Sequence, residues 1–458
     1  MDRIAYTPSP SRQHFRFTLP LFMLLTLVSS LSRIASAQDI FGEANKAPAD
    51  RTRVAVADFK PAAGSVDALR KTFDATLFND LQNAGIFDMV SKSIAPPVTP
   101  GSPAEMNLGQ WSPAPVSAAM VAFGSLGVTG GKLAVNGYLD DVKNAQFPQI
   151  LARQYSEDAS EDSARQIAHR FADEIISRLG GGISGIAETK IYFVHAAGGT
   201  KEIWEMDYDG ANQHPVTKLG QISLSPRVSP DNTRLAFTSL GPDGFRVKMY
   251  SMLLGRMVNF QGAGTSSISP AWAPNGKDIA YSASANGDFD IWISDVNGSL
   301  GRKVTNFKGP DMSPVFNPRT GGQIAWISGR TGLPQLYTME ADGSGVSRLT
   351  DTGYVSAPSW SPNGQFLAFG WNRKYGPGAP GGQDIYIMEI ASKKWLQLTH
   401  DGGQCDFPSW SPDGRHIVYA NSPDGRVEHM RIWTMLADGT DRRPLTGPGN
   451  DMPNWSWK

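Results

Sequence analysis

The glycines between residues 180 and 185 have a spacing that could bind a phosphate group. Gly180, Gly182 and Gly185 match the G-x-G-x-x-G pattern that holds a dinucleotide pyrophosphate at the start of a helix. Such a site needs a strand before the glycines and a helix after them. Here a helical pattern precedes the glycines and a strand pattern follows them, so we interpret this segment as a linker.

Other residue types that could carry out chemistry do not complete a site. Asp207 and Asp209 in DYDG resemble the start of a calcium loop, but the remaining ligands do not follow, which favours a turn. The seven histidines are scattered and H-E-x-x-H is absent. No serine lies in a G-x-S-x-G nucleophile elbow. We therefore expect neither a catalytic site nor a cofactor.

A repeat dominates the second half of the chain. Its anchor is a proline followed two residues later by a large apolar residue, and successive anchors are 44, 44, 44, 50 and 45 residues apart. The anchor prolines are Pro226, Pro270, Pro314, Pro358, Pro408 and Pro453. A period of this length with four short strands in each unit is typical of a β-propeller blade.

The strand count predicts how such a ring closes. The second, third and fourth strands of the unit occur six times, beginning at Lys190, whereas the first strand occurs five times before the end of the chain. We expect 450–458 to supply the missing strand beside Ile191–Val194, which removes the open sheet edges. The large residue of each anchor should pack between blades rather than bind a ligand: Trp272, Phe316, Trp360, Trp410 and Trp455.

The residues ahead of the repeat predict a small α/β domain, which we place at 51–185, with the propeller at 186–458. Strand patterns cover 53–59, IFDMV, 132–142 and 149–155, and helical patterns cover 66–84 and 160–179. Between them we expect a proline-rich loop from Ser91 to Pro115 and a short helix around Ala118. Mixed strands and helices of this kind form a layered α/β domain.

The amino-terminal residues 1–37 have the pattern of a signal peptide. Arginines precede the apolar run Leu19–Leu31, which is too short to span a bilayer, and Ala35-Ser36-Ala37 follows. Cleavage after Ala37 leaves a tail at 38–50 and no further membrane span. The remaining 38 Lys and Arg against 42 Asp and Glu argue against nucleic acid as a partner. The one cysteine, Cys405, cannot form an internal disulfide.

The combined features resemble the TolB family of the Tol-Pal system. The segments that carry the resemblance are FDATLFNDLQNAGIFD, IAHRFADEIISRLGGG and the repeated SPxWSPDG with DIW and LT. The resemblance implies a periplasmic, non-catalytic protein. It also implies binding of the lipoprotein Pal through the propeller and of TolA through the tail, in a system that maintains the outer membrane and its constriction during division. We expect the protein to be a monomer.

The partner face should be the one that carries the variable loops before each anchor proline. The resemblance places the Pal contacts at Ser269, Asp311, Met312, Ser356, Asp406, Phe407 and Asp451. It places the TolA contacts at Gln38, Asp39, Ile40 and Phe41. We expect the three aspartates to face solvent, pair with basic groups of the partner and add little to stability. Two alternatives stay open: glycan or metal binding at the pore, and an accessory domain of a hydrolase.

Overall fold

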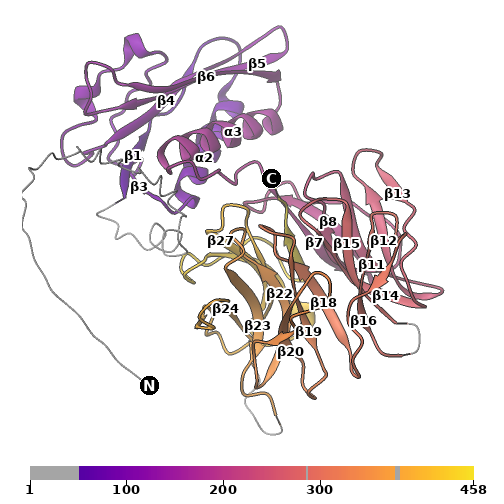
Figure 1. Cartoon of the computed structure of the whole chain (residues 1–458). Helices are drawn as coiled ribbons and strands as arrows, with labels where there is room; N and C mark the ends of the chain where they lie inside the picture. Colours follow the sequence, from indigo (N-terminus) through magenta and orange to yellow (C-terminus); the bar gives the residue numbers. More distant parts are fainter. Residues whose placement is uncertain (1–50, 285–286, 377–381, 458) are drawn as a thin grey trace, which may run out of the picture. The chain divides into compact units, whose positions relative to one another are not determined.

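The computed structural model describes residues 51–284, 287–376 and 382–457 of the 458-residue chain (Figure 1). The predicted signal peptide and the predicted TolA tail, with Gln38, Asp39, Ile40 and Phe41, lie outside the described residues. The described residues belong to one compact unit. None of the helices that they form is both long enough and apolar enough to cross a membrane.

The amino-terminal domain is built on one mixed sheet. Its strand order is β3-β1-β4-β5-β6, with β2 added beside β4. The two pairs made by β1 are parallel, and β4, β5 and β6 form an antiparallel meander. The strands are β1 (Thr52–Val56), β2 (Lys60–Pro61), β3 (Phe87–Met89), β4 (Met120–Thr129), β5 (Lys132–Asp141) and β6 (Gln149–Asp158).

The prediction of a helix around Ala118 is wrong, because this residue lies outside any helix and β4 begins two residues later, at Met120. In this central strand, Ala122 lies on one face of the sheet and Val121 and Phe123 lie on the other. Both faces are covered, so all three residues are buried and the sequence shows a continuous apolar run. Two short 3-10 helices, η2 (Pro103–Glu105) and η3 (Leu108–Gln110), lie inside the predicted loop instead.

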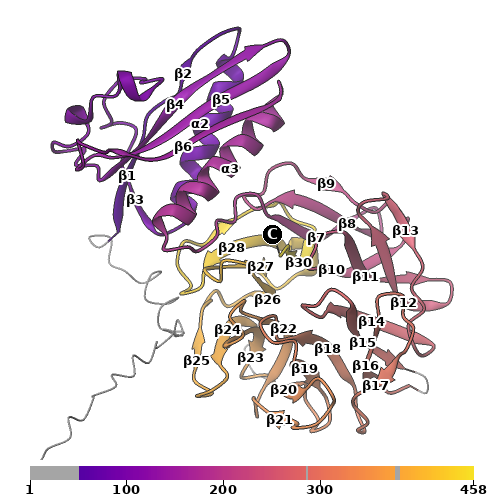
Figure 2. The ribbon, with the colours of Figure 1, turned by 45° about the horizontal axis from the view of Figure 1, so that its top comes forward.

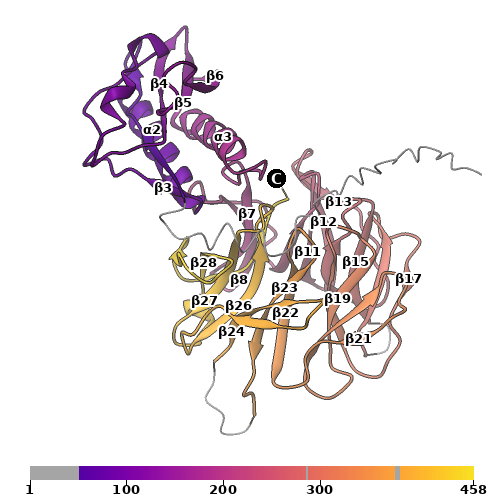
Figure 3. The same cartoon turned by 60° about the vertical axis from the view of Figure 1, so that its left-hand side comes forward.

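Two helices, α2 (Asp67–Asn83) and α3 (Glu161–Leu179), contact each other and share one core with the sheet (Figure 3). The α3 helix begins after Ser160, whose side chain accepts a hydrogen bond from the Ser163 N–H at 3.0 Å. Phe171 of α3 packs over Gly137 of β5, where a Cβ atom would lie 2.8 Å from its ring. The other face of the sheet is covered by the loop that carries the fully buried Trp111.

The β-rich carboxy-terminal region has a propeller-like arrangement, with sheets that follow one another round a common centre (Figure 2). Four sheets have four antiparallel strands each. They are β14 (Ser266–Trp272), β15 (Asp278–Ser284), β16 (Asp290–Asp295) and β17 (Arg302–Lys303); β18 (Asp311–Phe316), β19 (Gln323–Ser328), β20 (Gln335–Glu340) and β21 (Ser347–Arg348); β22 (Tyr354–Trp360), β23 (Phe366–Asn372), β24 (Asp384–Glu389) and β25 (Trp395–Gln397); and β26 (Gln404–Trp410), β27 (His416–Ser422), β28 (Arg431–Leu436) and β29 (Arg443–Pro444).

The remaining strands form one eight-stranded sheet, in which a single parallel pair, Ile222 with Lys201, joins two groups of four. One group is β10 (Ile222–Val228), β11 (Arg234–Gly241), β12 (Gly244–Ser251) and β13 (Arg256–Val258). The other is β30 (Asn450–Trp455), β7 (Lys190–Ala197), β8 (Thr200–Asp207) and β9 (His214–Pro215). Trp455 of β30 lies opposite Ile191 of β7, as the sequence predicts for this pair.

Each first strand of the repeat contains a β-bulge at the residue before the anchor proline. The pairing with the next strand shifts register there in every group, and for β30 it shifts against β7. The bulged residues have φ between 44° and 53°: Ser225, Ser269, Ser313, Ala357, Phe407 and Met452. None is glycine, so the surrounding sheet must hold a backbone conformation that these residues rarely adopt.

The anchor aromatics are buried, as predicted for residues that pack between sheets. The Trp272 indole donates a hydrogen bond to the Arg227 carbonyl at 2.9 Å, and the Trp360 indole donates one to the Val315 carbonyl at 3.1 Å. Each of these bonds links one first strand to another. The anchor tryptophans therefore fill the space between the first strands and also link these strands through hydrogen bonds.

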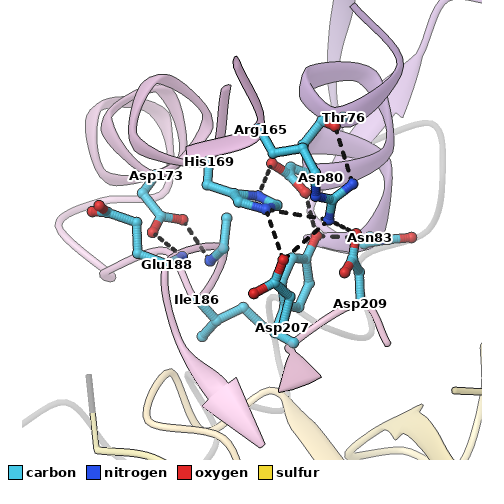
Figure 4. A network of polar contacts seen from close by, with 12 residues as sticks. Thr76, Asp80, Asn83, Arg165, His169, Asp173, Ile186, Glu188, Asp207 and Asp209 are labelled. Atoms are coloured by element: carbon cyan, nitrogen blue, oxygen red, sulfur yellow. Dashed lines mark hydrogen bonds and ion pairs between the residues drawn. The ribbon is translucent and has the colours of Figure 1, made fainter. Parts of the chain in front are cut away.

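A buried polar network links the α/β domain to the turn after β8 (Figure 4). Tyr208 donates a hydrogen bond to Asp80 at 2.6 Å, and His169 Nδ1 lies 2.8 Å from the same carboxylate. Arg165 forms ion pairs with Asp207 and Asp209. The DYDG segment is a turn, as predicted, since the Gly210 N–H donates to the Asp207 carbonyl. Its two carboxylates bind an arginine, which the calcium-loop pattern did not indicate.

Candidate functional site

Two cavities lie along the centre of the β-rich region. The larger has a volume of about 310 Å³ and is lined by anchor aromatics, prolines and the residues that follow the anchor prolines. The smaller, about 30 Å³, lies among the bulged residues. Of the seven predicted Pal contacts, Ser269 and Phe407 line this smaller cavity. Arg227 and Val315, which follow anchor prolines, line both cavities.

Asp311 is fully buried rather than exposed to a partner, with none of its surface accessible to solvent. It accepts a hydrogen bond from the Trp326 indole at 3.0 Å and pairs with Arg330 at 3.0 Å. The Arg330 guanidinium also lies 4.8 Å from the ring centre of the exposed Phe307. The ion pair therefore holds an arginine and an aromatic ring at the surface, while the carboxylate stays inside.

Asp406 lies in a second buried network, with 5% of its surface exposed. Its Oδ1 accepts hydrogen bonds from the Phe407 N–H and from the Ser356 hydroxyl, both at 2.7 Å. The Gln383 side-chain amide donates to the same hydroxyl at 2.7 Å. Burial outweighs these hydrogen bonds and raises the pKa of Asp406 to about 6. The structure thus brings together three of the predicted residues, Ser356, Asp406 and Phe407.

Asp451 repeats this arrangement in β30. It is 8% exposed, and its Oδ1 accepts a hydrogen bond from the Met452 N–H at 2.7 Å. Burial raises the pKa of Asp451. In both strands the carboxylate satisfies the N–H of the bulged residue that follows it. The side chain therefore stabilises the unusual backbone conformation at that position.

The expectation that Asp311, Asp406 and Asp451 face solvent is wrong, because all three are buried. The physical reason is that each carboxylate has partners inside the fold: Asp311 binds Trp326 and Arg330, and Asp406 and Asp451 each accept the N–H of the bulged residue that follows. The other predicted contacts, which are Ser269, Met312, Ser356 and Phe407, are partly buried and keep some exposed surface.

Sequence reasoning missed an aromatic surface cluster, which we define as Tyr354, Trp371, Arg373, Tyr375 and Trp395. The Arg373 guanidinium lies 5.0 Å from the ring centre of Trp371 and 4.3 Å from that of Trp395. The rings of Tyr354 and Tyr375 are 5.4 Å apart. Tyr375 and Trp395 are exposed. These residues come from separate strands and a loop, so no local pattern could have indicated the cluster.

Metal binding at the pore finds no support in the part of the chain that the structure describes. Within it, no group of three or more His, Cys, Asp or Glu side chains could hold a metal ion. The buried aspartates are instead bound to backbone N–H groups, hydroxyls, an indole or an arginine.

Family models cover most of the chain. The TolB amino-terminal domain matches residues 43–147, and the TolB beta propeller domain matches residues 178–458. A protein TolB homolog of Chlorobium luteolum is 32% identical over 341 residues, which are 74% of this chain and 75% of the relative. The Tol-Pal system protein TolB of Gluconobacter oxydans is 30% identical over 362 residues, with 68% of this chain and 77% of the relative covered.

A solved structure has the same fold over both domains. The crystal structure of TolB from Acinetobacter baumannii superposes with a TM-score of 0.73 at 23% sequence identity. The match covers 90% of this chain and 98% of that one. The two domains thus occur together in a known protein fold.

Proposed function

The chain belongs to the TolB family, and on this premise we propose that it is a periplasmic protein that binds Pal through its propeller and TolA through its tail. The observation that carries this proposal is the presence of both TolB domains in one chain. Membership supports a role in the Tol-Pal system, which includes outer-membrane integrity and constriction during division. Residues 1–37 would direct export and would be removed from the mature protein.

We further propose that the β-rich region is a six-bladed propeller closed by its carboxy-terminal strand. Support comes from the contacts among the first strands, in which each strand touches the next in a cyclic order: β10, β14, β18, β22, β26 and β30, and then β10 again. The pairing of β30 with β7 joins the end of the chain to the start of the region. Such closure leaves exposed only the short outermost strand of each sheet.

The proposed Pal face carries the loops before the anchor prolines together with the aromatic surface cluster. Tyrosine, tryptophan and arginine are enriched at the centres of protein interfaces, where they contribute most of the binding energy. Arg373 between two indoles and the exposed Tyr375 have this composition. The partly exposed Met312 and Phe407 can add apolar contacts. These features favour a protein ligand over a reaction, and we propose no catalytic activity.

Pal binding can be tested by calorimetry with the mature protein and the soluble domain of Pal. Replacement of Tyr375 and Trp395 by Ala should weaken Pal binding at least roughly tenfold, because exposed aromatic anchors are typical interface hot spots. Leu300→Ala is the matched control, since this side chain is 88% exposed on a turn between β16 and β17. Unchanged Pal affinity in the double variant would place the interface elsewhere.

TolA binding is tested separately with protein that lacks residues 38–50. Loss of binding to the soluble carboxy-terminal domain of TolA, with Pal affinity retained, is the expected result. Equal TolA binding by the shortened and the mature protein would show that the tail is only a linker.

A further inference from the structure

The residue after each anchor proline lines the larger cavity. The six side chains at this repeated position are Arg227, Ala271, Val315, Ser359, Ser409 and Asn454. Five are small or neutral, and Arg227 is the one with a charge. Arg227 also lines the smaller cavity, so its side chain lies where the two cavities approach each other.

The Arg227 guanidinium has few partners within the protein. Its Nη1 donates to the neighbouring Pro226 carbonyl at 2.8 Å. Among the described residues, no carboxylate forms an ion pair with it. Burial lowers the pKa of Arg227 to about 10, which leaves the group cationic at neutral pH. A guanidinium carries five N–H donors, so most of its hydrogen-bonding capacity is free for a ligand.

Two serines add hydrogen-bond donors at the same level of the cavity. The Ser409 hydroxyl oxygen accepts from the Trp455 N–H at 3.0 Å, and the Ser359 oxygen accepts from the Trp410 N–H at 3.3 Å. Because both oxygens act as acceptors in these bonds, each hydroxyl hydrogen can be donated to a ligand. One cation and two hydroxyl donors suit an anion and disfavour a metal ion.

Most of the remaining wall is apolar, and it contains several aromatic rings. It includes Trp272, Phe316, Trp360, Trp410 and Trp457. The Trp457 indole donates to the Val228 carbonyl at 3.2 Å, in the same manner as the indoles of Trp272 and Trp360. The volume of about 310 Å³ is at the lower end of the range for small-molecule sites.

We propose that the larger cavity binds a small organic anion, with a carboxylate at Arg227 and a flat apolar body against the tryptophan wall. All six side chains at the positions after the anchor prolines line this cavity, whereas none of the seven predicted Pal contacts does. The proposal does not depend on the proposed Pal and TolA partners.

The test compares two probes of the same shape with the mature protein. Indole-3-acetate carries a carboxylate, and indole-3-acetamide is its neutral counterpart. Calorimetry should show that the acetate binds at least roughly tenfold more tightly, since hydrogen bonds to charged groups are the stronger ones. Inorganic phosphate, which has charge but no apolar body, should bind at least roughly tenfold more weakly than indole-3-acetate.

Variants of Arg227 test whether this residue causes the preference for indole-3-acetate over indole-3-acetamide. Arg227→Gln should abolish the preference for the acetate, and Arg227→Lys should retain it. Arg246→Gln is the matched control, because this arginine lies away from the cavity and donates to the Gly264 carbonyl. Equal binding of the two indoles to the unaltered protein, equal binding of phosphate, or an unchanged preference in Arg227→Gln would each overturn the proposal. Absence of binding by indole-3-acetate would overturn it as well.

Discussion

Replacement of Trp455 by Ala tests whether the carboxy-terminal strand holds the β-rich region together. Trp455 is 3% exposed, and its indole donates to the Thr189 hydroxyl at 2.7 Å. Its backbone N–H donates to Ser409 at 3.0 Å, and the following residue, Ser456, donates to the Lys190 carbonyl at 2.8 Å. The strand is thus bound on one side to β7 and on the other to β26.

The expected loss follows from the burial of the indole. Truncation of a buried Trp to Ala typically costs about 3–5 kcal/mol, and the Thr189 oxygen loses in addition the hydrogen bond that it accepts from the indole. Whole domains are stable by only about 5–15 kcal/mol, so this single change removes a large part of the total. Deletion of residues 450–458 removes the whole pairing with β7 and should unfold the region.

Urea unfolding followed by circular dichroism measures this loss without depending on the tryptophan signal. The control is Trp395→Ala, since Trp395 is 43% exposed and should cost about 1 kcal/mol or less. If Trp455→Ala lost no more stability than the control, or if the shortened protein unfolded at the original urea concentration, closure by the last strand would be refuted.

Three further changes test other parts of the structure. Asp406→Asn should alter the pH dependence of stability. In the unaltered protein the pKa of Asp406 is raised from the ordinary 3.8 to about 6, so folding favours the protonated carboxyl. The stability that this gives below about pH 4 is therefore lost as the pH rises to 6. The difference in free energy of unfolding between the variant and the unaltered protein should therefore shift by about 3 kcal/mol in favour of the variant between pH 4 and 7, as measured by urea titrations. A difference that does not change with pH would contradict the argument that burial raises the pKa of Asp406. Asp311→Ala should destabilise by about 3–5 kcal/mol because it leaves Arg330 without its buried partner, whereas a neutral result in thermal unfolding would show that the pair is dispensable. Gly137→Val should destabilise the α/β domain by about 1–3 kcal/mol through the clash with Phe171, and the double variant with Phe171→Ala should lose less stability than the sum of the two single losses, whereas additive losses would contradict the clash.

The repeat could be predicted from the sequence because its signals are local. Each anchor proline lies two residues before a large apolar residue and 44 to 50 residues from the next anchor, so the prediction of Pro226 and Pro453 needs no knowledge of the fold. The predicted helix at 160–179 agrees with α3 for the same reason, since Ser160 caps it and the glycines end it. β4 was missed because its burial on both faces removes the alternation that identifies a strand.

The site depends on contacts that no local pattern contains. Arg373 lies against the rings of Trp371 and Trp395, which come from different strands, and Asp311 binds an arginine from beyond the next strand. The positive φ of Phe407 was equally hidden, because sequence patterns associate that conformation with glycine or asparagine. The contacts of these side chains and the backbone conformation of Phe407 are determined by the packing of the assembled sheets.

The bulge also determines how the aspartates can be tested for partner binding. Residues held in such backbone conformations cost about 1–3 kcal/mol each, and the carboxylates of Asp406 and Asp451 offset part of this cost by accepting the next N–H. Replacement by Ala removes this acceptor, so it would alter the shape of the loop and the charge together. Replacement by Asn keeps an acceptor oxygen and removes only the charge. Weaker Pal binding in the Ala variants alone would therefore identify the aspartates as supports of the loop, whereas weaker binding in both sets would identify their charge as the contact.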